Sequence, residues 1–342
     1  STIPAENYPF CTIDSNICIV EINDQRLNAI ADIFNPKTIK PTTIEFVDIA
    51  GLVRGASKGD GLGNQFLSHI REVDAVIHVV RSFKEDNVTH VEGSLNPDRD
   101  VKIIETELLI RDINTVKKRI IKLKKTVGNR DKKEKEELKV LNIIYPKMNN
   151  GELVHDIQLD SNQIKLINPL FLLTNKPTLY VANVDEDEIA KEKRNPMLQK
   201  LFDSAEKRDN VVIRLCGRLE TQISNLQNEE KSFFLKEYNL HELGVDKLIH
   251  ASYKLLNLES FFTGGDKQVR AWTISKDATA PQAAREIHTD MERGFIKAEI
   301  YSYDELMQYR SESALKDAGK IRQEGKNYIV NDGDIIFFKF NV

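Results

Sequence analysis

The pentapeptide Asp48-Ile49-Ala50-Gly51-Leu52 holds a carboxylate and a glycine at a spacing suited to binding a metal ion and a phosphate. The run that contains Asp48 is β-branched and apolar, so residues 43–50 are expected to form a strand. In many phosphate-loop triphosphatases such an Asp belongs to the Mg²⁺ shell, and the Gly contacts the γ-phosphate through its backbone N–H. An ordinary turn after a strand has the same sequence, so other residues must decide between the two interpretations.

The segments on either side contain further groups for this chemistry. Upstream, the loop 7–12 offers the Thr12 hydroxyl, a usual Mg²⁺ ligand in nucleotide switches. Downstream, residues 55–63 are dense in glycine, but their spacing is not the dinucleotide fingerprint, and a helix is expected at 65–72. We interpret residues 55–63 as a segment that reorders with the γ-phosphate; the alternative is a flexible surface loop.

A possible base-binding group is Asn183-Val184-Asp185-Glu186, which follows a predicted strand at 177–182. Open α/β sheets bind ligands at the carboxyl ends of their strands, so Asn183, Val184 and Glu186 are candidate nucleotide contacts. GTPases usually carry Asn-Lys-x-Asp here, and the Asp accepts two hydrogen bonds from guanine. Glu186 without the Lys argues against guanine. Cys216-Gly217, after a predicted strand at 211–215, is the expected second base loop and would act through backbone groups.

The elements that position these residues indicate an α/β fold. Four runs are apolar on both faces, as in a buried parallel sheet: 43–50, 73–80, 177–182 and 211–215. Between the second and third, apolar residues recur at helical spacing over 101–127, and a second helix is expected over 131–145, ending before Pro146. This predicts an antiparallel helical hairpin inserted into the α/β domain.

The C-terminal part reads as a small α+β domain. Its expected elements are a helix near 282–292 and strands at 269–274, 296–301, 328–330 and 335–340, with a turn at 331–334. The expected domains are an α/β nucleotide-binding domain over 1–100 and 152–257, a helical arm over 101–151, and the C-terminal domain over 258–342.

Composition restricts the function classes. A chain of 342 residues with 40% hydrophobic and 30% charged residues predicts two or three folded domains and excludes disorder as the main state. Three cysteines without a Cys-x-x-Cys pair indicate a reducing compartment. Neither a membrane span nor a signal peptide is recognisable, so a cytoplasmic location and no membrane partner are expected.

Charge is segregated along the chain. Residues 116–139 hold 11 Lys/Arg and 4 Asp/Glu, a net +7, which leaves −11 on the remainder of a chain whose total is −4. A basic hairpin tip can lie along RNA phosphates, whereas a solvated, lysine-rich helix is the plainer alternative. The concentration of positive charge in one segment favours RNA binding over a merely solvated helix. The candidate RNA-binding residues are Lys117, Lys118, Arg119, Lys122, Lys124, Lys125, Arg130, Lys132 and Lys133.

Taken together and in this order, these segments resemble the YchF/Obg-like ATPase family over the whole chain. The matching residues are 7–14, 46–67, 183–186 and a C-terminal block of 269–274, 280–284 and 288–290. The resemblance implies a phosphate-loop NTPase domain of the Obg type, a helical arm and a ubiquitin-like TGS domain. It also implies Mg²⁺-dependent hydrolysis of ATP in preference to GTP, and association with the ribosome through the arm and the TGS domain.

The sequence departs from the family pattern in two places. It contains no Gly-x-x-x-x-Gly-Lys-Ser/Thr loop, and by register about two dozen residues of the family pattern, including that loop, precede Ser1. We expect the intact protein to hydrolyse ATP and a chain starting at Ser1 to bind nucleotide poorly, because that loop supplies a lysine and a nest of N–H groups. Ser-Ala is also common in the family where Cys216-Gly217 stands.

Catalysis in such a site needs a group that orients the attacking water. Leu52 stands where Ras-like GTPases place a Gln, and leucine cannot orient water. His90 matches a family histidine proposed to enter the site, so His90 and Gly51 are the candidate catalytic residues; a surface role is the alternative for His90. His78, inside an apolar run, is predicted to be a packed core histidine.

The leading interpretation is a cytoplasmic, ribosome-associated ATPase in which ATP and Mg²⁺ order Thr12 and residues 51–63. Asp48 and Thr12 would be the metal ligands. One alternative is a GTPase of the same fold. The other is a non-catalytic RNA- or protein-binding module.

Overall fold

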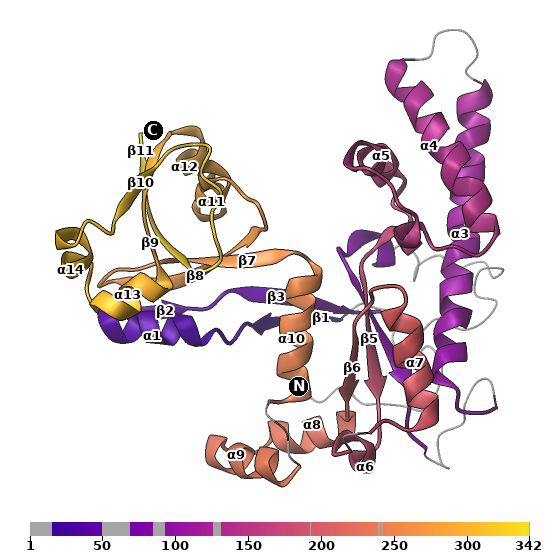
Figure 1. The fold of residues 1–342 in the computed structure, drawn as a ribbon, viewed down its shortest axis with the longest axis horizontal. Helices are drawn as coiled ribbons and strands as arrows, with labels where there is room; N and C mark the ends of the chain where they lie inside the picture. Colours follow the sequence, from indigo (N-terminus) through magenta and orange to yellow (C-terminus); the bar gives the residue numbers. More distant parts are fainter. Residues whose placement is uncertain are drawn as a thin grey trace. The chain divides into compact units, whose positions relative to one another are not determined.

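The computed structural model describes residues 16–49, 69–84, 93–125, 131–191, 193–238, 240 and 242–341. The described chain forms two compact units, coloured along the sequence in Figure 1. The first unit holds residues 16–17 and 47–248, and the C-terminal unit holds residues 18–46 and 249–341. The α/β fold class predicted from the sequence is confirmed.

The first unit contains a three-stranded parallel sheet of β4 (Val76–Arg81), β5 (Thr178–Asn183) and β6 (Val212–Leu215), in that order. Three of the predicted buried strands therefore form, each within a few residues of its expected range. Helices α3 and α7 pack against β4 and β5 through Val101, Leu198 and Leu201. The fourth predicted strand is β3 (Thr43–Asp48), which pairs with β1 (Asn16–Glu21) in a separate sheet.

The predicted helical hairpin is present as α3 (Pro97–Lys125) and α4 (Lys132–Asn149), which lie side by side in Figure 1. The expected end of the second helix at Tyr145 is wrong, because α4 continues through Pro146. Ile144 and Met148, on either side of the proline, are both fully buried in the hairpin core. Their packing offsets the hydrogen bond that the proline cannot donate.

The hairpin is anchored to the sheet by a buried carboxylate. Asp112 of α3 accepts hydrogen bonds from the Leu173 N–H at 2.9 Å, and from the Thr174 N–H and hydroxyl at 2.7 Å each. Burial raises the pKa of Asp112, and these hydrogen bonds oppose the rise by favouring the charged form. Asp112 therefore ties α3 to the segment that precedes β5.

Short elements complete the first unit. They are η2 (Val154–Asp156), α5 (Ser161–Ile167), η3 (Asn168–Leu170), η4 (Leu173–Asn175), α6 (Glu186–Ile189), α7 (Pro196–Glu206), α8 (Gly217–Ser224) and α9 (Asn228–Glu237). Helix α10 (Gly244–Leu255) begins in the first unit and ends in the C-terminal unit.

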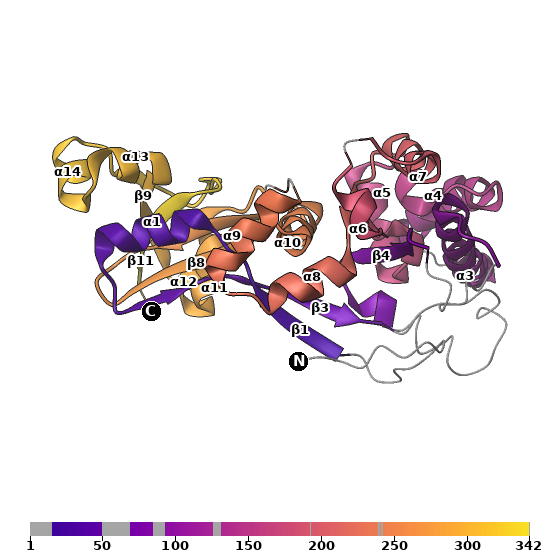
Figure 2. The ribbon, with the colours of Figure 1, turned by 90° about the horizontal axis from the view of Figure 1, so that it is seen from below.

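The C-terminal unit is built on a six-stranded mixed sheet of order β10-β9-β11-β7-β8-β2. Helices α11 and α12 cover one face, and α1, α13 and α14 cover the other, as Figure 2 helps to show. The bounds are β2 (Thr38–Lys40), β7 (Leu258–Thr263), β8 (Gln268–Ser275), β9 (Phe295–Ser302), β10 (Arg322–Glu324), β11 (Asp334–Phe340), α1 (Gln25–Phe34), α11 (Ala280–Ile287), α12 (Thr289–Arg293), α13 (Tyr303–Tyr309) and α14 (Glu312–Asp317).

Two predicted elements of this unit need correction. The single helix expected near 282–292 is two helices, because His288 has an extended backbone (φ −163°, ψ 141°) and its ring accepts from the Asp290 N–H. The expected strand at 328–330 forms only an isolated bridge, between Ile329 and Thr279. The turn at 331–334 is confirmed, with Gly333 at φ +91°, where glycine is favoured.

Residues 18–46 were predicted to belong to the nucleotide-binding domain. In the structure they pack with the C-terminal sheet. Leu27 and Ile30 of α1 are buried against Phe262 and Ile335, and β2 adds a parallel strand beside β8. Asp24 is the N-cap residue before α1, and its carboxylate accepts the Arg26 N–H. The sheet of the C-terminal unit is therefore completed by a distant part of the sequence.

Replacing Ile30, which is fully buried, tests this packing. We expect Ile30→Ala to lower the unfolding free energy of the C-terminal unit by about 2–5 kcal/mol, because it leaves a cavity under α1. Trp272, the one tryptophan of the chain, lies on β8, so its fluorescence in urea reports this unit. Ile296→Ala, at a side chain 57% exposed, is the control and should cost less than about 1 kcal/mol. Equal losses would contradict the role given to α1.

Candidate functional site

The carboxyl ends of β5 and β6 bring two of the predicted base-binding segments together. Asn183 lies opposite Leu215 in the parallel register, and the Val184 N–H donates to the Leu215 carbonyl at 2.8 Å. The Asn183 side-chain oxygen accepts the Gly217 N–H at 3.0 Å. The Asn183–Val184 and Cys216–Gly217 segments are thus hydrogen-bonded neighbours, as the ends of adjacent strands predict.

Within this group, Val184 and Cys216 contribute through their backbones. The Val184 side chain is buried in the core of the sheet, and the Cys216 side chain is only 3% exposed. Burial raises the pKa of the Cys216 thiol, so it stays neutral. A Cβ at position 217 would lie 3.5 Å from Asn183 Oδ1, an ordinary contact, so this loop is not restricted to glycine.

Glu186 is the acidic side chain of the group. Glu186 is the first residue of α6. The carboxylate of Asp185, the residue before it, accepts the Lys84 N–H at 3.3 Å. The Glu186 carboxylate is 35% exposed, and the Arg218 guanidinium approaches it at 4.0 Å. Sequence reasoning missed Arg218, because only the fold brings the start of α8 beside α6. Glu186 is therefore an accessible acceptor at the edge of the Asn183–Gly217 group.

Asp48 is the last residue of β3 and is exposed. Among the described residues, no hydrogen bond or ion pair joins Asp48 to the Asn183–Gly217 group, and no three His, Cys, Asp or Glu side chains gather as a metal cage. Mg²⁺ in phosphate-binding sites takes one or two carboxylates together with waters and phosphate oxygens. A single accessible carboxylate at a strand end fits that role.

The other residues predicted for phosphate chemistry lie outside the described residues. They are Thr12, Gly51 and His90, together with the glycine-dense segment 55–63. Their roles stay predictions.

His78 of β4 is half-buried, so the predicted core position is met only in part. Its ring centre is 5.9 Å from that of Tyr180 on β5. The Tyr180 hydroxyl donates to Glu105, which also pairs with Arg208 at 2.7 Å. Burial lowers the pKa of His78 to about 4, although the nearby carboxylates of Glu105 and Asp100 oppose this. His78 is therefore a neutral packing residue at physiological pH.

The basic residues of the arm differ in their surroundings. Arg119 is joined to Glu137 of α4 by two hydrogen bonds of 2.6 Å, so its guanidinium links the two helices. That pairing raises the pKa of Arg119, and it makes Arg119 a weaker RNA candidate than its neighbours. Arg130 lies outside the described residues. The exposed candidates are Lys117, Lys118, Lys122, Lys124, Lys125, Lys132 and Lys133.

The exposed lysines of α3 follow the helical period. Val116, Ile120 and Leu123 face the hairpin core, which places Lys118, Lys122 and Lys125 on the opposite side of the helix. No helix among the described segments is both long and apolar enough to cross a bilayer.

Comparison with known proteins places this geometry in a family. Residues 2–125 match the family model MMR_HSR1, described as a 50S ribosome-binding GTPase, and residues 258–341 match YchF-GTPase_C, described as a protein of unknown function. The "Ribosome-binding ATPase YchF" of Pasteurella multocida is 48% identical over 340 residues, 99% of this chain and 93% of that protein. The chain belongs to the YchF family.

Other YchF proteins agree with this assignment. The "Ribosome-binding ATPase YchF" of Bacillus subtilis is 47% identical over 98% of this chain and 92% of its own length. The solved structure of the Schizosaccharomyces pombe YchF GTPase superposes with a TM-score of 0.86 at 36% identity, covering 97% of this chain and 90% of that one. The YchF assignment supports a ribosome-binding, nucleotide-hydrolysing protein.

The lowered pKa of the half-buried His78 generates a pH prediction. Because its folded pKa of about 4 lies below the ordinary 6.5, protonation favours the unfolded chain. Stability is fully present above about pH 6.5 and falls as the pH drops toward 4, by about 2 kcal/mol at pH 5. NMR titration of the ring, assigned with His78→Gln, measures the pKa, and the variant should lose this part of the pH dependence. A His78 titration near pH 6.5 would show that its surroundings do not lower its pKa.

Proposed function

We propose that this protein is a ribosome-associated switch that, in its intact form, binds and hydrolyses ATP in preference to GTP. The observation that carries the proposal is the accessible Glu186 carboxylate beside the Asn183–Gly217 group, in a sequence without the lysine of Asn-Lys-x-Asp.

The preference follows from hydrogen-bond chemistry at the base. Guanine offers two adjacent donors that an Asp carboxylate accepts together, whereas adenine offers its exocyclic amine next to a ring acceptor. The Glu186 side chain is one methylene longer than that Asp. Its carboxylate also lies 4.0 Å from the Arg218 guanidinium, which competes for the same oxygens. A 100-fold preference needs only about 2.7 kcal/mol, or roughly two good hydrogen bonds. A small change at this position can therefore decide between bases.

We assign the binding of the nucleotide's phosphates and of Mg²⁺ to residues at strand ends and in loops. Asp48 and Thr12 would hold Mg²⁺, which neutralises charge on the phosphate oxygens when bound. The Gly51 N–H would contact the γ-phosphate, and His90 would take over the orientation of water, since Leu52 cannot. These roles rest on the family pattern and on the exposed position of Asp48 at the end of β3.

The ribosome contact is assigned to the arm over 101–151 and to the C-terminal domain, proposed to be a TGS domain over 258–342. Residues 18–46, predicted to belong to the nucleotide domain over 1–100 and 152–257, pack with the C-terminal domain and are assigned to it. The lysine face of α3, directed away from the hairpin core, supports contact with rRNA phosphates. The relatives named ribosome-binding ATPase support the same partner, which would place the protein in the cytoplasm.

A GTPase of the same fold is the second candidate. It is favoured by the name "YchF GTPase" given to the Schizosaccharomyces pombe protein, and by the GTPase family model over residues 2–125. A non-catalytic RNA-binding module is the third, and it would bind ribosomes with equal affinity whether or not nucleotide is present.

The base preference is tested by competition of ATP and GTP for the intact protein. We expect ATP to bind at least about tenfold more tightly, and Glu186→Asp to reduce that ratio severalfold by shortening the acceptor. Asp187→Glu, at the exposed neighbouring residue, is the matched control and should leave the ratio unchanged. A GTP preference in the unmodified protein would favour the GTPase alternative.

The arm is tested through the salt dependence of ribosome binding. Replacing Lys118, Lys122 and Lys125 by Gln should weaken binding and lower the slope of log K against log salt by about 2–3, because each lost phosphate contact removes about 0.7–0.9. The same change at the exposed Lys193, Lys200 and Lys207, outside the arm, is the control. Equal effects of the two triple variants would rule out a specific role for the arm.

A further inference from the structure

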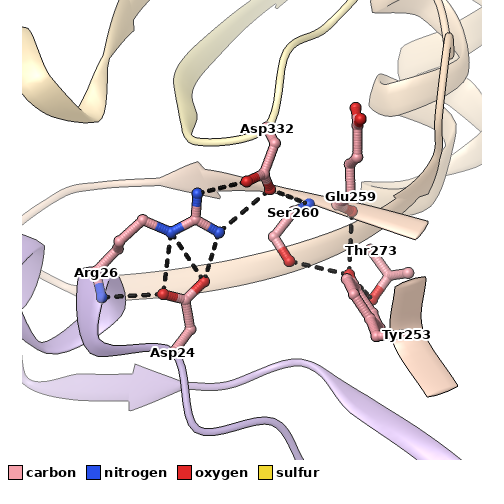
Figure 3. Close-up of polar contacts among 7 residues, drawn as sticks. All are labelled: Asp24, Arg26, Tyr253, Glu259, Ser260, Thr273 and Asp332. Carbon is pink, nitrogen blue, oxygen red and sulfur yellow. Dashed lines mark hydrogen bonds and ion pairs between the residues drawn. The ribbon is translucent and has the colours of Figure 1, made fainter. Parts of the chain in front are cut away.

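Arg270 of β8 is a half-buried arginine without a carboxylate partner. In the same unit, Arg26 donates to both Asp24 and Asp332, and Figure 3 shows its guanidinium between the two carboxylates. Arg270 differs, because among the described residues its Nε has no hydrogen-bond partner and its guanidinium forms no ion pair. A cation that has lost part of its water is costly to bury, unless a ligand supplies the missing acceptor.

The Arg270 guanidinium is held in place by the indole of Trp272. It lies over the indole, 3.7 Å from the ring centre. The indole is fixed in turn, because its Nε1–H donates to the Thr263 hydroxyl at 3.0 Å and its ring stacks with Phe261 at 6.4 Å between centres. The guanidinium is therefore oriented before any ligand arrives, and it stays partly exposed.

Two further donors lie on the same face of the sheet beside Arg270. Lys40, on the edge strand β2, is its partner in the parallel register, and Thr263 of β7 is its partner in the antiparallel one. Opposite residues of paired strands share a face. The Thr263 hydroxyl oxygen accepts from Trp272, so its own hydrogen can donate to a ligand. Arg270, Lys40 and Thr263 thus form a row of donors across three strands.

The beginnings of β2 and β8 add positive charge. Lys37 precedes β2 and Lys267 precedes β8, and the Lys37 N–H donates to the Asp266 carbonyl at 3.2 Å. Both lysines are exposed, and like Lys40 they have no ion pair within the described part of the chain. Together with Arg270 they place four cations beside one acidic residue, Asp266, in a chain whose net charge is −4. This edge of the sheet therefore attracts anions.

The chemistry of these donors suits a phosphate. A stacked guanidinium donates through a fork that matches two oxygens of one phosphate, and an ammonium and a hydroxyl add further donors. A basic edge that follows two strands suits a polymer with regularly repeated charges. RNA also has bases that can stack on a guanidinium plane, whereas an acidic peptide has neither a regular charge spacing nor planar bases. The arrangement therefore favours RNA.

We propose that Arg270, Lys40 and Thr263, together called the Arg270 site, bind the phosphates of single-stranded RNA at the β8–β2 edge of the C-terminal sheet. The inference rests on the proposed function, because ribosome association would supply the RNA. It deepens that function by assigning an RNA contact to named residues of the C-terminal unit.

The single tryptophan of the chain reports binding at the Arg270 site. Because Arg270 lies on Trp272, bound RNA should change the Trp272 fluorescence. The full chain, with the three arm lysines replaced as above, is titrated with a single-stranded RNA of about 12 nucleotides. We expect Arg270→Gln to weaken binding about tenfold and Lys40→Gln about threefold, each lowering the slope of log K against log salt by about 0.7. Arg293→Gln, at an exposed residue of α12, is the matched control and should change neither quantity.

Two variants separate RNA binding from folding. Lys40 is exposed, so Lys40→Gln should leave the urea midpoint of unfolding unchanged. Arg270→Lys keeps the charge but loses the fork, so it should weaken RNA binding about threefold and keep the salt slope. If both variants bind RNA like the parent chain, the Arg270 site is wrong, even where Arg270→Gln is destabilised.

Other ligands test the choice of RNA. Inorganic phosphate, at the same concentration of phosphate groups, should change the fluorescence much less than RNA does. An equal change would assign the site to free anions and would overturn the proposal. Polyglutamate binding as tightly as RNA would assign the site to an acidic protein and would overturn it as well.

The outcomes also separate this inference from the proposed function. If ribosomes bind the intact protein through the arm and the Arg270 and Lys40 variants bind RNA normally, the Arg270 site is wrong and the proposed function stands. If RNA binds at the Arg270 site but the intact protein binds neither ribosomes nor ATP, the proposed function fails and the Arg270 site stands.

Discussion

The parallel alignment of β5 with β6 determines where the candidate site forms. It places Asn183 opposite Leu215, so the Asn183 amide oxygen meets the Gly217 N–H at 3.0 Å, and Glu186 and Arg218 follow on the next turns of chain. The position of β5 depends in turn on Asp112, whose buried carboxylate holds the residues before that strand.

The C-terminal unit obeys a different constraint. A small sheet with apolar side chains on both faces must cover both of them, and a short chain has few elements with which to do so. Helices α11 and α12 cover one face, while α1 contributes Leu27, Ile30 and Ala31 to the other. The polar Asp24–Arg26–Asp332 contacts then fix the position of a helix whose apolar packing alone is not directional.

The local patterns in the sequence predicted the local structure well. Runs of β-branched residues became β3, β4, β5 and β6, and the helical period gave the arm, because these signals arise within a few neighbouring residues. The neighbouring positions of Asn183 and Gly217 followed from a general rule about strand ends. Pairings between distant residues could not be predicted from the sequence. Arg26 and Asp332 are 306 positions apart. The pairing of Arg119 with Glu137 depends on how α3 and α4 are rotated about their own axes. The helix end predicted before Pro146 was wrong, because the packing of Ile144 and Met148 in the hairpin core outweighs the tendency of proline to end a helix.

The location of α1 also has a consequence for synthesis of the chain. Arg26 and Asp332 are separated by 306 residues, so at about 5–20 residues per second the ribosome needs roughly 15–60 s to make the second partner after the first. For most of that time Leu27 and Ile30 lack their packing partners, because Phe262 and Val269 are made late and Ile335 later still. The C-terminal unit therefore cannot finish folding until β11, its last strand in the sequence, has been synthesised.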